Sequence, residues 1–343
     1  MPGLLDQNAA GGLAAPYALE EEAEAKGRPL MPVFGPIPSR RLGRSLGLNM
    51  IPPKICTYAC IYCQVGSTIR MQTRREAFIE PERLFREVEE KVSAARASGE
   101  SIDYLTFVPD GEPTLERHLR RQMRLLRDLE IKIAVITNAS LIWREDVRRD
   151  LREADWVSLK VDAVDASTWR HVNRPHRSLQ LSWIMDGMLD FAAEFEGELN
   201  TETMLVRDLN DSPADAGQLA EFLARLAPER AYLSVPTRPP AEAWVQPPTE
   251  QALTAFYQKL SETVRGVEYL VSYEGNEFTS TSDVEDDLLS ITAVHPMREE
   301  AVRELISRTQ ADWSIVERLL ERRLLLKTEH EHTTFYTRPL PRR

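Results

Sequence analysis

The chain has 343 residues, a formal net charge of −11 and a hydrophobic content of 42%. That length exceeds what one compact core holds comfortably, so we expect one large domain and a small one. No apolar run reaches the roughly 18 residues of a membrane span, the N-terminus lacks a secretory pattern, and the acidic balance argues against a generally adhesive nucleic-acid binder, so composition indicates a cytoplasmic protein without membrane contacts.

Residues 1–30 are rich in Ala, Gly and Glu, and we expect a flexible N-terminal extension there. Residues 45–52 read as a first strand, and helical and strand-like segments then alternate as far as residue 275. The further expected strands span 101–109, 131–139, 156–163, 198–206, 230–236 and 266–275. The expected helices span 81–99, 114–130 (with Thr114 as N-cap), 144–154, 178–195, 212–227 and 249–264.

These segments make at least six strand–helix units, which is typical of a parallel sheet that is doubly wound or barrel-like. We assign this α/β domain to residues 31–280. Active residues of such sheets gather at the carboxyl ends of the strands. Polar side chains follow four of the expected strands: Asp110 and Glu112, Thr137 and Asn138, Lys160 and Asp162, and Arg207 and Asp208.

Residues 281–343 are expected to form a separate C-terminal module. Two amphipathic helices are predicted over 297–310 and 312–323, and residues 324–338 alternate like a two-stranded hairpin, so the module is winged-helix-like. From residue 295 onward there are ten Lys and Arg against eight Asp and Glu. Because this excess is small, a packing or protein-contact role is slightly favoured over nucleic-acid binding.

All three cysteines, Cys56, Cys60 and Cys63, lie within eight consecutive positions at a C-x3-C-x2-C spacing. Without an export signal, clustered thiols indicate a reducing compartment and not a disulfide scaffold. Zinc usually takes a fourth Cys or His, but there is no fourth Cys and no His within fifty residues of Cys63. A [4Fe–4S] cluster held by three thiolates leaves one iron open. We favour the cluster; zinc and buried structural thiols are the alternatives.

The segment around the cysteines is basic. From Lys26 to Arg75 there are nine Lys and Arg and no Asp or Glu. Two interpretations have similar weight. These side chains pair with carboxylates elsewhere in an acidic chain, or they create a positive field around an anionic cofactor and an anionic substrate.

The cysteine spacing, with aromatic Tyr62 directly before the last cysteine, resembles the signature of the radical S-adenosylmethionine (SAM) enzymes. The resemblance implies a partial (β/α)6 TIM-like barrel with the cluster loop after its first strand. It also implies that SAM chelates the open iron through its amino and carboxylate groups. One electron from the cluster then cleaves SAM, and the 5′-deoxyadenosyl radical abstracts hydrogen from the substrate.

The segment "PDGEPTL" is similar to the motif that receives the SAM ammonium group in these enzymes. By this resemblance Glu112 is the acceptor and Gly111 lets the backbone come close. Asp110 replaces the usual first glycine, and a turn role is its alternative. Tyr62 is expected to position the adenine.

Two further segments match cofactor-binding positions of the family. In "ITNAS", Thr137 and Asn138 stand where ribose and carboxylate contacts occur, although Asn138 also suits a turn. In "SLKVD", Ser158, Lys160 and Asp162 share one face of a strand. If that face is the barrel interior, Lys160 meets the SAM carboxylate; if it faces the helices, three buried polar groups need other partners.

The segments "GPIPSRRLGRSLGLNMIPPKICTYACIYCQVG", "FVPDGEPTL", "HVNRP" and "VPTRPPAEAWVQPP" carry a closer resemblance, which spans roughly residues 33–275. It is to prokaryotic iron–sulfur oxidoreductases related to the tRNA-modifying wybutosine-biosynthesis enzyme. That enzyme is expected to need a second cluster with its own cysteines, and this chain has none left over. A single-cluster enzyme is therefore predicted, whose radical acts directly on the substrate.

Arginines give the best indication of the substrate, because guanidinium groups suit phosphate and carboxylate. An anionic substrate is expected, such as a nucleotide, a tRNA segment or a phosphorylated metabolite. The alternative is that the arginines fix loops by binding backbone carbonyls. Six side chains are expected at the barrel mouth as substrate contacts: Arg40, Arg41, Arg44, Asn173, Arg174 and Arg238.

Three functions fit the sequence. The first is a radical SAM enzyme acting on RNA or a nucleotide, with an electron donor such as flavodoxin or ferredoxin as partner. The second is a radical SAM enzyme modifying a protein, peptide or small metabolite. The third is a non-enzymatic iron–sulfur sensor with a DNA-binding winged helix, against which the weakly basic module and the complete set of barrel units count.

Overall fold

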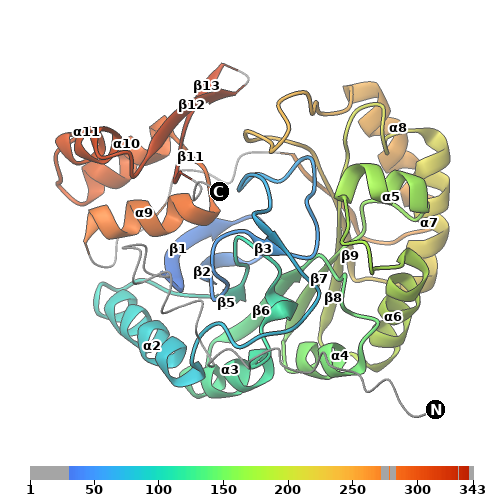
Figure 1. Ribbon diagram of the computed structural model, residues 1–343, viewed down its shortest axis with the longest axis horizontal. Coiled ribbons are helices and arrows are strands. Elements are labelled where there is room, and N and C mark those ends of the chain that lie inside the picture. Colours follow the sequence, from blue (N-terminus) through green and yellow to red (C-terminus); the bar gives the residue numbers. More distant parts are fainter. Residues whose placement is uncertain (1–30, 272–277, 279–282, 331, 340–343) are drawn as a thin grey trace, which may run out of the picture.

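The computed structural model describes residues 31–271, 278, 283–330 and 332–339; the predicted N-terminal extension and the predicted boundary at residue 280 lie outside these ranges. Within them, eight strands form one curved sheet in the order β1-β2-β5-β6-β7-β8-β9-β10 (Figure 1). The strands are β1 (Val33–Ser39), β2 (Gly43–Leu48), β5 (Tyr104–Phe107), β6 (Lys132–Thr137), β7 (Trp156–Lys160), β8 (Glu198–Met204), β9 (Arg230–Ser234) and β10 (Val267–Leu270).

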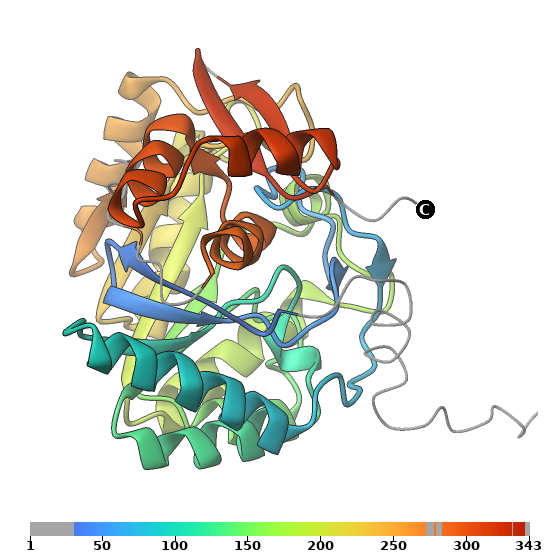
Figure 2. The same ribbon diagram turned by 90° about the vertical axis from the view of Figure 1, so that its left-hand side faces the viewer.

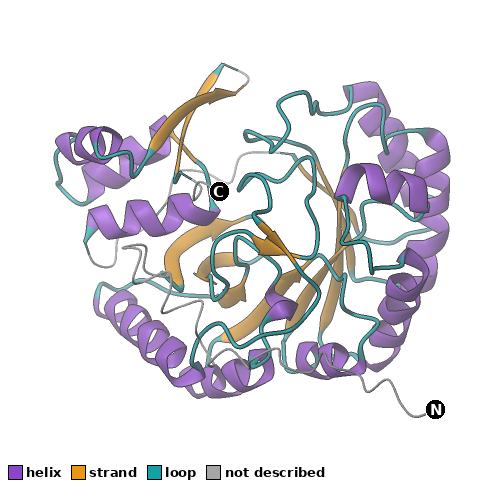
Figure 3. Ribbon diagram, in the orientation of Figure 1, coloured by secondary structure: helices purple, strands orange, loops and turns teal. Residues whose placement is uncertain are grey.

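Neighbouring strands from β2 to β10 are all parallel, and only β1 pairs antiparallel with β2. In the large sheet, each of the strands β2 and β5 to β9 is followed by at least one helix before the next strand of the sheet. Figure 3 shows these helices as an outer arc around the strands. The expected partial TIM-like barrel is therefore confirmed. The helices are α2 (Pro81–Ala97), α3 (Leu119–Leu126), α4 (Glu145–Leu151), α5 (Ala166–Asn173), α6 (Leu181–Glu194), α7 (Pro213–Leu226) and α8 (Glu250–Ser261).

The two faces of the sheet differ because side chains alternate along each strand. On β7, Val157 and Leu159 belong to the large apolar core between the sheet and the helices. Trp156 and Lys160 point the other way; Trp156 packs in a small cluster inside the curve, and Lys160 lines a cavity. The concave side of the sheet thus carries both an apolar cluster around Trp156 and polar side chains such as Lys160.

Three local predictions were wrong or incomplete. β1 was not predicted, because Pro36 and Pro38 interrupt the strand pattern; as an edge strand it tolerates the missing N–H groups. α5 was also missed. Thr114 is not the N-cap of a long helix, because Glu112 caps a single 3-10 turn, η1 (Pro113–Leu115), and α3 begins only at Leu119.

The C-terminal residues form a second layer beside β1 (Figure 2). The predicted helix pair and hairpin are present, and a strand β11 and a helix α9 precede them; Ile37 of β1 packs against the core of this layer. Identification as a winged helix stays a prediction. The elements are α9 (Val284–Val294), β11 (Met297–Arg298), α10 (Glu299–Arg308), α11 (Ser314–Glu321), β12 (Leu326–His330) and β13 (Thr333–Thr337).

Among the helices that the structure describes, none has both the length and the apolar composition that crossing a bilayer requires.

Candidate active site

The three cysteines lie in the loop between β2 and α2, at the carboxyl end of the parallel strands. A short strand β3 (Ile55–Cys56) pairs with β4 (Arg70–Met71) and fixes the start of the loop. The N–H of Cys63 donates to the carbonyl of Cys60 at 3.2 Å, which closes a turn between them. All three cysteines are free, and each residue is partly buried. The fold therefore gathers them in one short turn-forming segment.

Each cysteine sulfur faces an N–H donor from a neighbouring side chain. Asn138 Nδ2 lies 3.6 Å from Cys56 Sγ and Asn173 Nδ2 lies 3.4 Å from Cys60 Sγ. Lys54 Nζ lies 3.2 Å from Cys63 Sγ. Polar donors around sulfur suit thiolates that carry negative charge.

Burial raises the pKa of the Cys56 thiol to about 12 and raises that of Cys60 as well. Metal binding requires the thiolate form, so it is coupled here to proton release. Within the described ranges, no three His, Cys, Asp or Glu side chains converge on a point suited to a single metal ion. A cubane has a different requirement, one thiolate for each of three irons, and the donor set of this loop fits it.

The loop after β5 lies directly on the strand that leads to the cysteines. A Cβ added to Gly111 would stand 2.1 Å from the carbonyl oxygen of Ile55. The N–H of Glu112 donates to the same oxygen at 3.3 Å. The expected close approach at Gly111 is therefore present, and the neighbour is the backbone of the cysteine loop.

Gly111→Ala is expected to destabilise the protein by roughly 1–3 kcal/mol, because the backbone of Ile55 must move to admit the methyl group. Chemical unfolding of the metal-free protein measures this. Gly217→Ala is the matched control, since Gly217 lies inside α7 with nothing within 4 Å of its added Cβ; it should be stabilising by about 0.5–1 kcal/mol. Equal stability of the Gly111 variant and the parent would contradict the close approach.

Glu112 is buried and already fully engaged by the protein. Its Oε1 accepts from the N–H of Thr114 at 3.0 Å, the hydroxyl of Thr114 at 2.6 Å and the hydroxyl of Thr137 at 2.5 Å. Its Oε2 accepts from the N–H of Asn138 at 2.9 Å. Burial raises its pKa, and these donors oppose the rise. Glu112 thus ties the ends of β5 and β6 together, and its contact with SAM stays a prediction.

Asp110 and Ser158 are buried with one oxygen each, Oδ1 and Oγ, that has no hydrogen-bond partner among the described residues. Burial raises the pKa of Asp110 to about 6. Orphaned buried oxygens are uncommon in folded proteins and need a reason. A ligand or ordered water at these positions would satisfy them.

Inside the curved sheet, four side chains form one polar network. The hydroxyl of Tyr62 donates to Asp162, and Lys160 Nζ lies 3.4 Å from Asp162 Oδ1 and 3.0 Å from Glu202 Oε1. The Lys160 ammonium also lies 5.1 Å from the centre of the Tyr62 ring. Burial lowers the pKa of Lys160, but Asp162 and Glu202 outweigh it and raise the pKa overall. Lys160 therefore stays charged inside the barrel.

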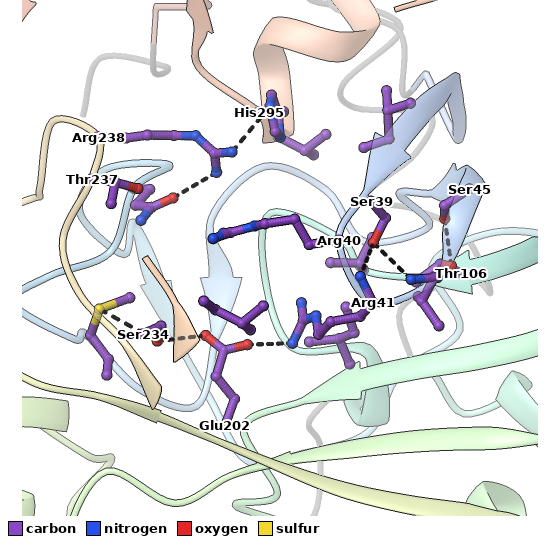
Figure 4. Close-up of a pocket in the computed structure, with 18 of the residues that line it drawn as sticks. Ser39, Arg40, Arg41, Ser45, Thr106, Glu202, Ser234, Thr237, Arg238 and His295 are labelled. Carbon is purple, nitrogen blue, oxygen red and sulfur yellow. Dashed lines mark hydrogen bonds and ion pairs between the residues drawn. The ribbon is translucent and has the colours of Figure 1, made fainter. Parts of the chain in front are cut away.

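A cavity of about 310 Å³ extends from this network to the cysteine loop and the C-terminal layer (Figure 4). Figure 4 shows Arg40 and Arg41 from the β1–β2 turn directed into it, with Arg238 on the opposite side. Arg238 donates to Gln64 Oε1 at 2.8 Å and lies 3.2 Å from His295 Nε2. Of the predicted site residues, the cavity brings together Tyr62, Cys63, Lys160, Arg40, Arg41 and Arg238.

Several polar cavity residues were missed from the sequence, and three of them are central to its contacts. Glu202 on β8 binds both Lys160 and Arg41, Ser234 on β9 donates to Glu202 at 3.0 Å, and His295 follows α9. Glu202 could have been found from the sequence, because it lies two residues before Met204 on β8 and side chains two positions apart on a strand share one face. Nothing in the sequence indicated His295, because its position depends on how the C-terminal layer packs.

Arg44, Asn173 and Arg174 do not line the cavity, and for Arg44 the expected position at the barrel mouth is wrong. Arg44 binds Glu100 and its N–H donates to Asp103, so it lies at the amino ends of the strands, where a residue that leads into a parallel strand must lie. Asn173 is buried beside Cys60, with its Nδ2 2.6 Å from Asp162 Oδ2.

Arg174 is exposed and forms a salt bridge with Glu242. Ile136 of "ITNAS" lines the cavity, but Thr137, Asn138 and the residues of "PDGEPTL" do not. Glu112 and Asn138 instead contact the cysteine loop at Ile55 and Cys56.

The basic segment is largely paired with carboxylates, as the first of the two interpretations held. Five of its arginines form salt bridges with Asp or Glu. The most buried is Arg75, which binds both Asp146 and Asp150 and two backbone carbonyls. The five are Arg41, Arg44, Arg70, Arg74 and Arg75.

Comparison with known proteins agrees with this site. The model of the radical SAM superfamily matches residues 50–223, about half of the chain. UPF0026 protein MJ1312 of Methanocaldococcus jannaschii is 45% identical over 312 residues, which covers 90% of this chain and 97% of that protein.

Two solved structures share the fold. One is TYW1 with a lysine–pyruvate adduct bound, at a TM-score of 0.50 and 19% identity over 64% of this chain and 74% of that chain. The other is a radical SAM methyltransferase from Sphaerobacter thermophilus, at a TM-score of 0.50 and 18% identity over 66% of this chain and 67% of that chain. With a superfamily match that contains the cysteine loop and a relative aligned over almost its whole length, this chain belongs to the radical SAM superfamily of enzymes, among the UPF0026 proteins.

Proposed function

We propose that this protein is a single-cluster radical SAM enzyme that acts on an anionic substrate held between the barrel and the C-terminal layer. Superfamily membership implies a [4Fe–4S] cluster and SAM; Cys56, Cys60 and Cys63 are the cluster ligands in this proposal. When bound, these groups supply one-electron cleavage of SAM and a radical that abstracts hydrogen. The observation that carries the proposal is one cavity that runs from Cys63 to three arginines.

On the cofactor side, the chain supplies orientation and charge. Asp162 holds the Tyr62 hydroxyl, and Asp162 with Glu202 holds Lys160 in its charged form beside that ring. Lys160 lines the cavity, so its ammonium is the group that we expect to bind the SAM carboxylate. Ser158 lies two residues before Lys160 on the same face of β7, and its buried hydroxyl has no hydrogen-bond partner among the described residues.

On the substrate side, Arg40 and Arg238 supply positive charge, and hydroxyls of Ser39, Ser234 and Thr237 supply neutral hydrogen bonds. This combination favours a phosphate or carboxylate. The cavity of about 310 Å³ has to admit SAM at Lys160 as well, so it favours a substrate no larger than a single nucleotide or a small phosphorylated metabolite. An RNA substrate would have to place one nucleotide in the cavity.

The C-terminal layer contributes Val294 and His295 to the cavity wall. This favours a role for the layer in closing the substrate site over a role as a separate DNA-binding unit. A low-potential electron donor, flavodoxin or ferredoxin, and a cytoplasmic location remain part of the proposal.

The test is 5′-deoxyadenosine formation by anaerobically reconstituted protein with SAM and dithionite. We expect formation to increase with a nucleotide or with RNA. Stimulation only by a cell extract freed of nucleic acid and nucleotides would favour the protein, peptide or metabolite alternative. Zinc in place of iron in anaerobically purified protein, or a reconstituted cluster that never cleaves SAM, would overturn the proposal.

Glu112→Ala is expected to weaken SAM binding at least tenfold while the cluster absorbance stays intact. The reason is that removal of the carboxylate releases four donors that tie the ends of β5 and β6 together beside the cysteine loop. Equilibrium binding of SAM to the reconstituted protein measures it. Unchanged affinity would show that neither a direct contact nor this loop matters for SAM.

A further inference from the structure

The three donors to the cysteine sulfurs come from three separate parts of the chain. Asn138 follows β6, Asn173 ends α5, and Lys54 precedes β3. One donor faces each sulfur, so the arrangement does not depend on a single local turn. Two of the donors are neutral amides, and the third carries a full positive charge.

Lys54 is held tightly where it stands. It is only 2% exposed, and its backbone adopts a left-handed conformation with φ of 60°. Its carbonyl accepts from the N–H groups of Ile69 and Arg70 at 3.0 and 3.2 Å. In the part of the chain that the structure describes, Cys63 is the side-chain partner of its ammonium, and no carboxylate forms a salt bridge with it.

A buried cation is costly to a folded protein unless negative charge lies nearby. The thiolates of Cys63 and Cys56 are the strongest negative partners of Lys54, and the Asp110 carboxylate adds to them. A metal cluster with three thiolate ligands gains one further negative charge when it is reduced. Positive charge and N–H donors at the sulfurs favour the reduced form more than the oxidised form.

We infer that Lys54, assisted by Asn138 and Asn173, raises the reduction potential of the cluster by donating to its three cysteine ligands. This inference rests on the proposed function, because it presupposes a cluster on Cys56, Cys60 and Cys63. Lys54 acts through the cysteine sulfur and is a positioning and tuning residue. The electron comes from the low-potential protein donor, and Lys54 neither gives nor takes a proton in the step.

The experiment is a redox titration of the reconstituted cluster followed by electron paramagnetic resonance, without SAM. Lys54→Met removes charge and donor at similar length, Lys54→Gln keeps a neutral donor, and Lys54→Arg keeps both. Lys91→Met is the matched control, because Lys91 also pairs within the fold, 2.9 Å from Asp287, but on α2 and away from the cysteines.

At the midpoint potential of the parent protein, the ratio of reduced to oxidised cluster in Lys54→Met should fall at least tenfold, a shift of about 59 mV or more to negative values. The midpoint potential of Lys54→Gln should lie between those of Lys54→Met and the parent. The midpoint potentials of Lys54→Arg and Lys91→Met should match that of the parent. Asn173→Ala should shift in the same direction by less, because a neutral donor is weaker.

Identical midpoints in the Met, Gln and Arg variants would overturn the inference and leave the proposed function intact. If Lys54→Met assembles no cluster, the comparison of Gln with Arg decides in the same way, and Asn173→Ala decides if the Gln variant also fails. A parent protein that assembles no [4Fe–4S] cluster would overturn the proposed function and this inference together.

Discussion

Cys60→Ala is expected to remove the visible absorbance of the iron–sulfur cluster and to reduce SAM cleavage to below about 1% of the parent rate, because two thiolates do not hold a cubane that needs three. The chain has no further cysteine to take over. Iron and sulfide content, absorbance and 5′-deoxyadenosine formation measure the effect in one anaerobic preparation.

Thr73→Ala is the control for that variant. Thr73 lies in the same loop, and its hydroxyl makes a long 3.5 Å contact with Ser178 on the protein surface. It should keep iron, absorbance and SAM cleavage. Full iron content and cleavage in Cys60→Ala would refute the assignment of the three cysteines as the cluster ligands.

Glu202→Gln is expected to lower the free energy of unfolding of the metal-free protein by about 3 kcal/mol at pH 7, since it leaves two buried cations with one carboxylate fewer. Glu202 binds Arg41 through Oε2 at 2.5 Å and Lys160 through Oε1 at 3.0 Å, and the three side chains are 14–16% exposed. Urea unfolding of parent and variant measures the difference.

The effect should depend on pH in a defined direction. Burial alone would raise the pKa of Glu202, but Lys160 and Arg41 outweigh it and hold the pKa well below the usual 4.5. A carboxyl with a lowered pKa in the folded state stabilises the protein above its unfolded value and loses this contribution as the pH falls. The difference between parent and Glu202→Gln should therefore be full at pH 6–7 and shrink below about pH 4.5.

Glu198→Gln separates a charge effect from a hydrogen-bond effect on the same strand. Glu198 Oε1 accepts from Trp156 Nε1 at 3.0 Å and from Asn200 Nδ2 at 3.1 Å, both neutral donors. Its substitution should cost only about 1 kcal/mol. If Glu202→Gln costs no more than Glu198→Gln, or if its cost does not change with pH, the ion-pair network does not stabilise the barrel.

Much of the barrel could be predicted from the sequence, because each helix and strand carries its own apolar period. The segment 81–99 shows this well: α2 occupies Pro81–Ala97, and Gly99 follows it with φ of 77°. β1 escaped prediction for a local reason, since two prolines within seven residues conceal an edge strand. α9 escaped because its acidic first turn masks the apolar face that packs on β1.

The cysteines could be assigned to one site from the sequence, whereas the contacts between the cavity residues could not. Cys56, Cys60 and Cys63 are close in sequence, so their spacing alone indicated a shared site. The pairing of Lys160 with Glu202 depends on the register between β7 and β8, and that of Arg41 with Glu202 on a turn 161 positions away. Neither contact follows from a local pattern.

Arg44 shows a different limit. Its charge and its position near Arg40 and Arg41 suggested a common role, but successive side chains of an extended chain point to opposite faces. Ser45 faces the cavity, and Arg44 instead binds Glu100. The position of each arginine along its strand must therefore be known before that arginine is assigned to a ligand.

The most direct measurement of the central claim is the electron paramagnetic resonance spectrum of the reduced cluster with and without SAM. Three protein ligands leave one iron open, so added SAM should change the spectrum of the parent protein, and 5′-deoxyadenosine should accumulate as the signal decays. A cubane spectrum that SAM leaves unchanged would mean that the cluster has no open position, and would contradict the account.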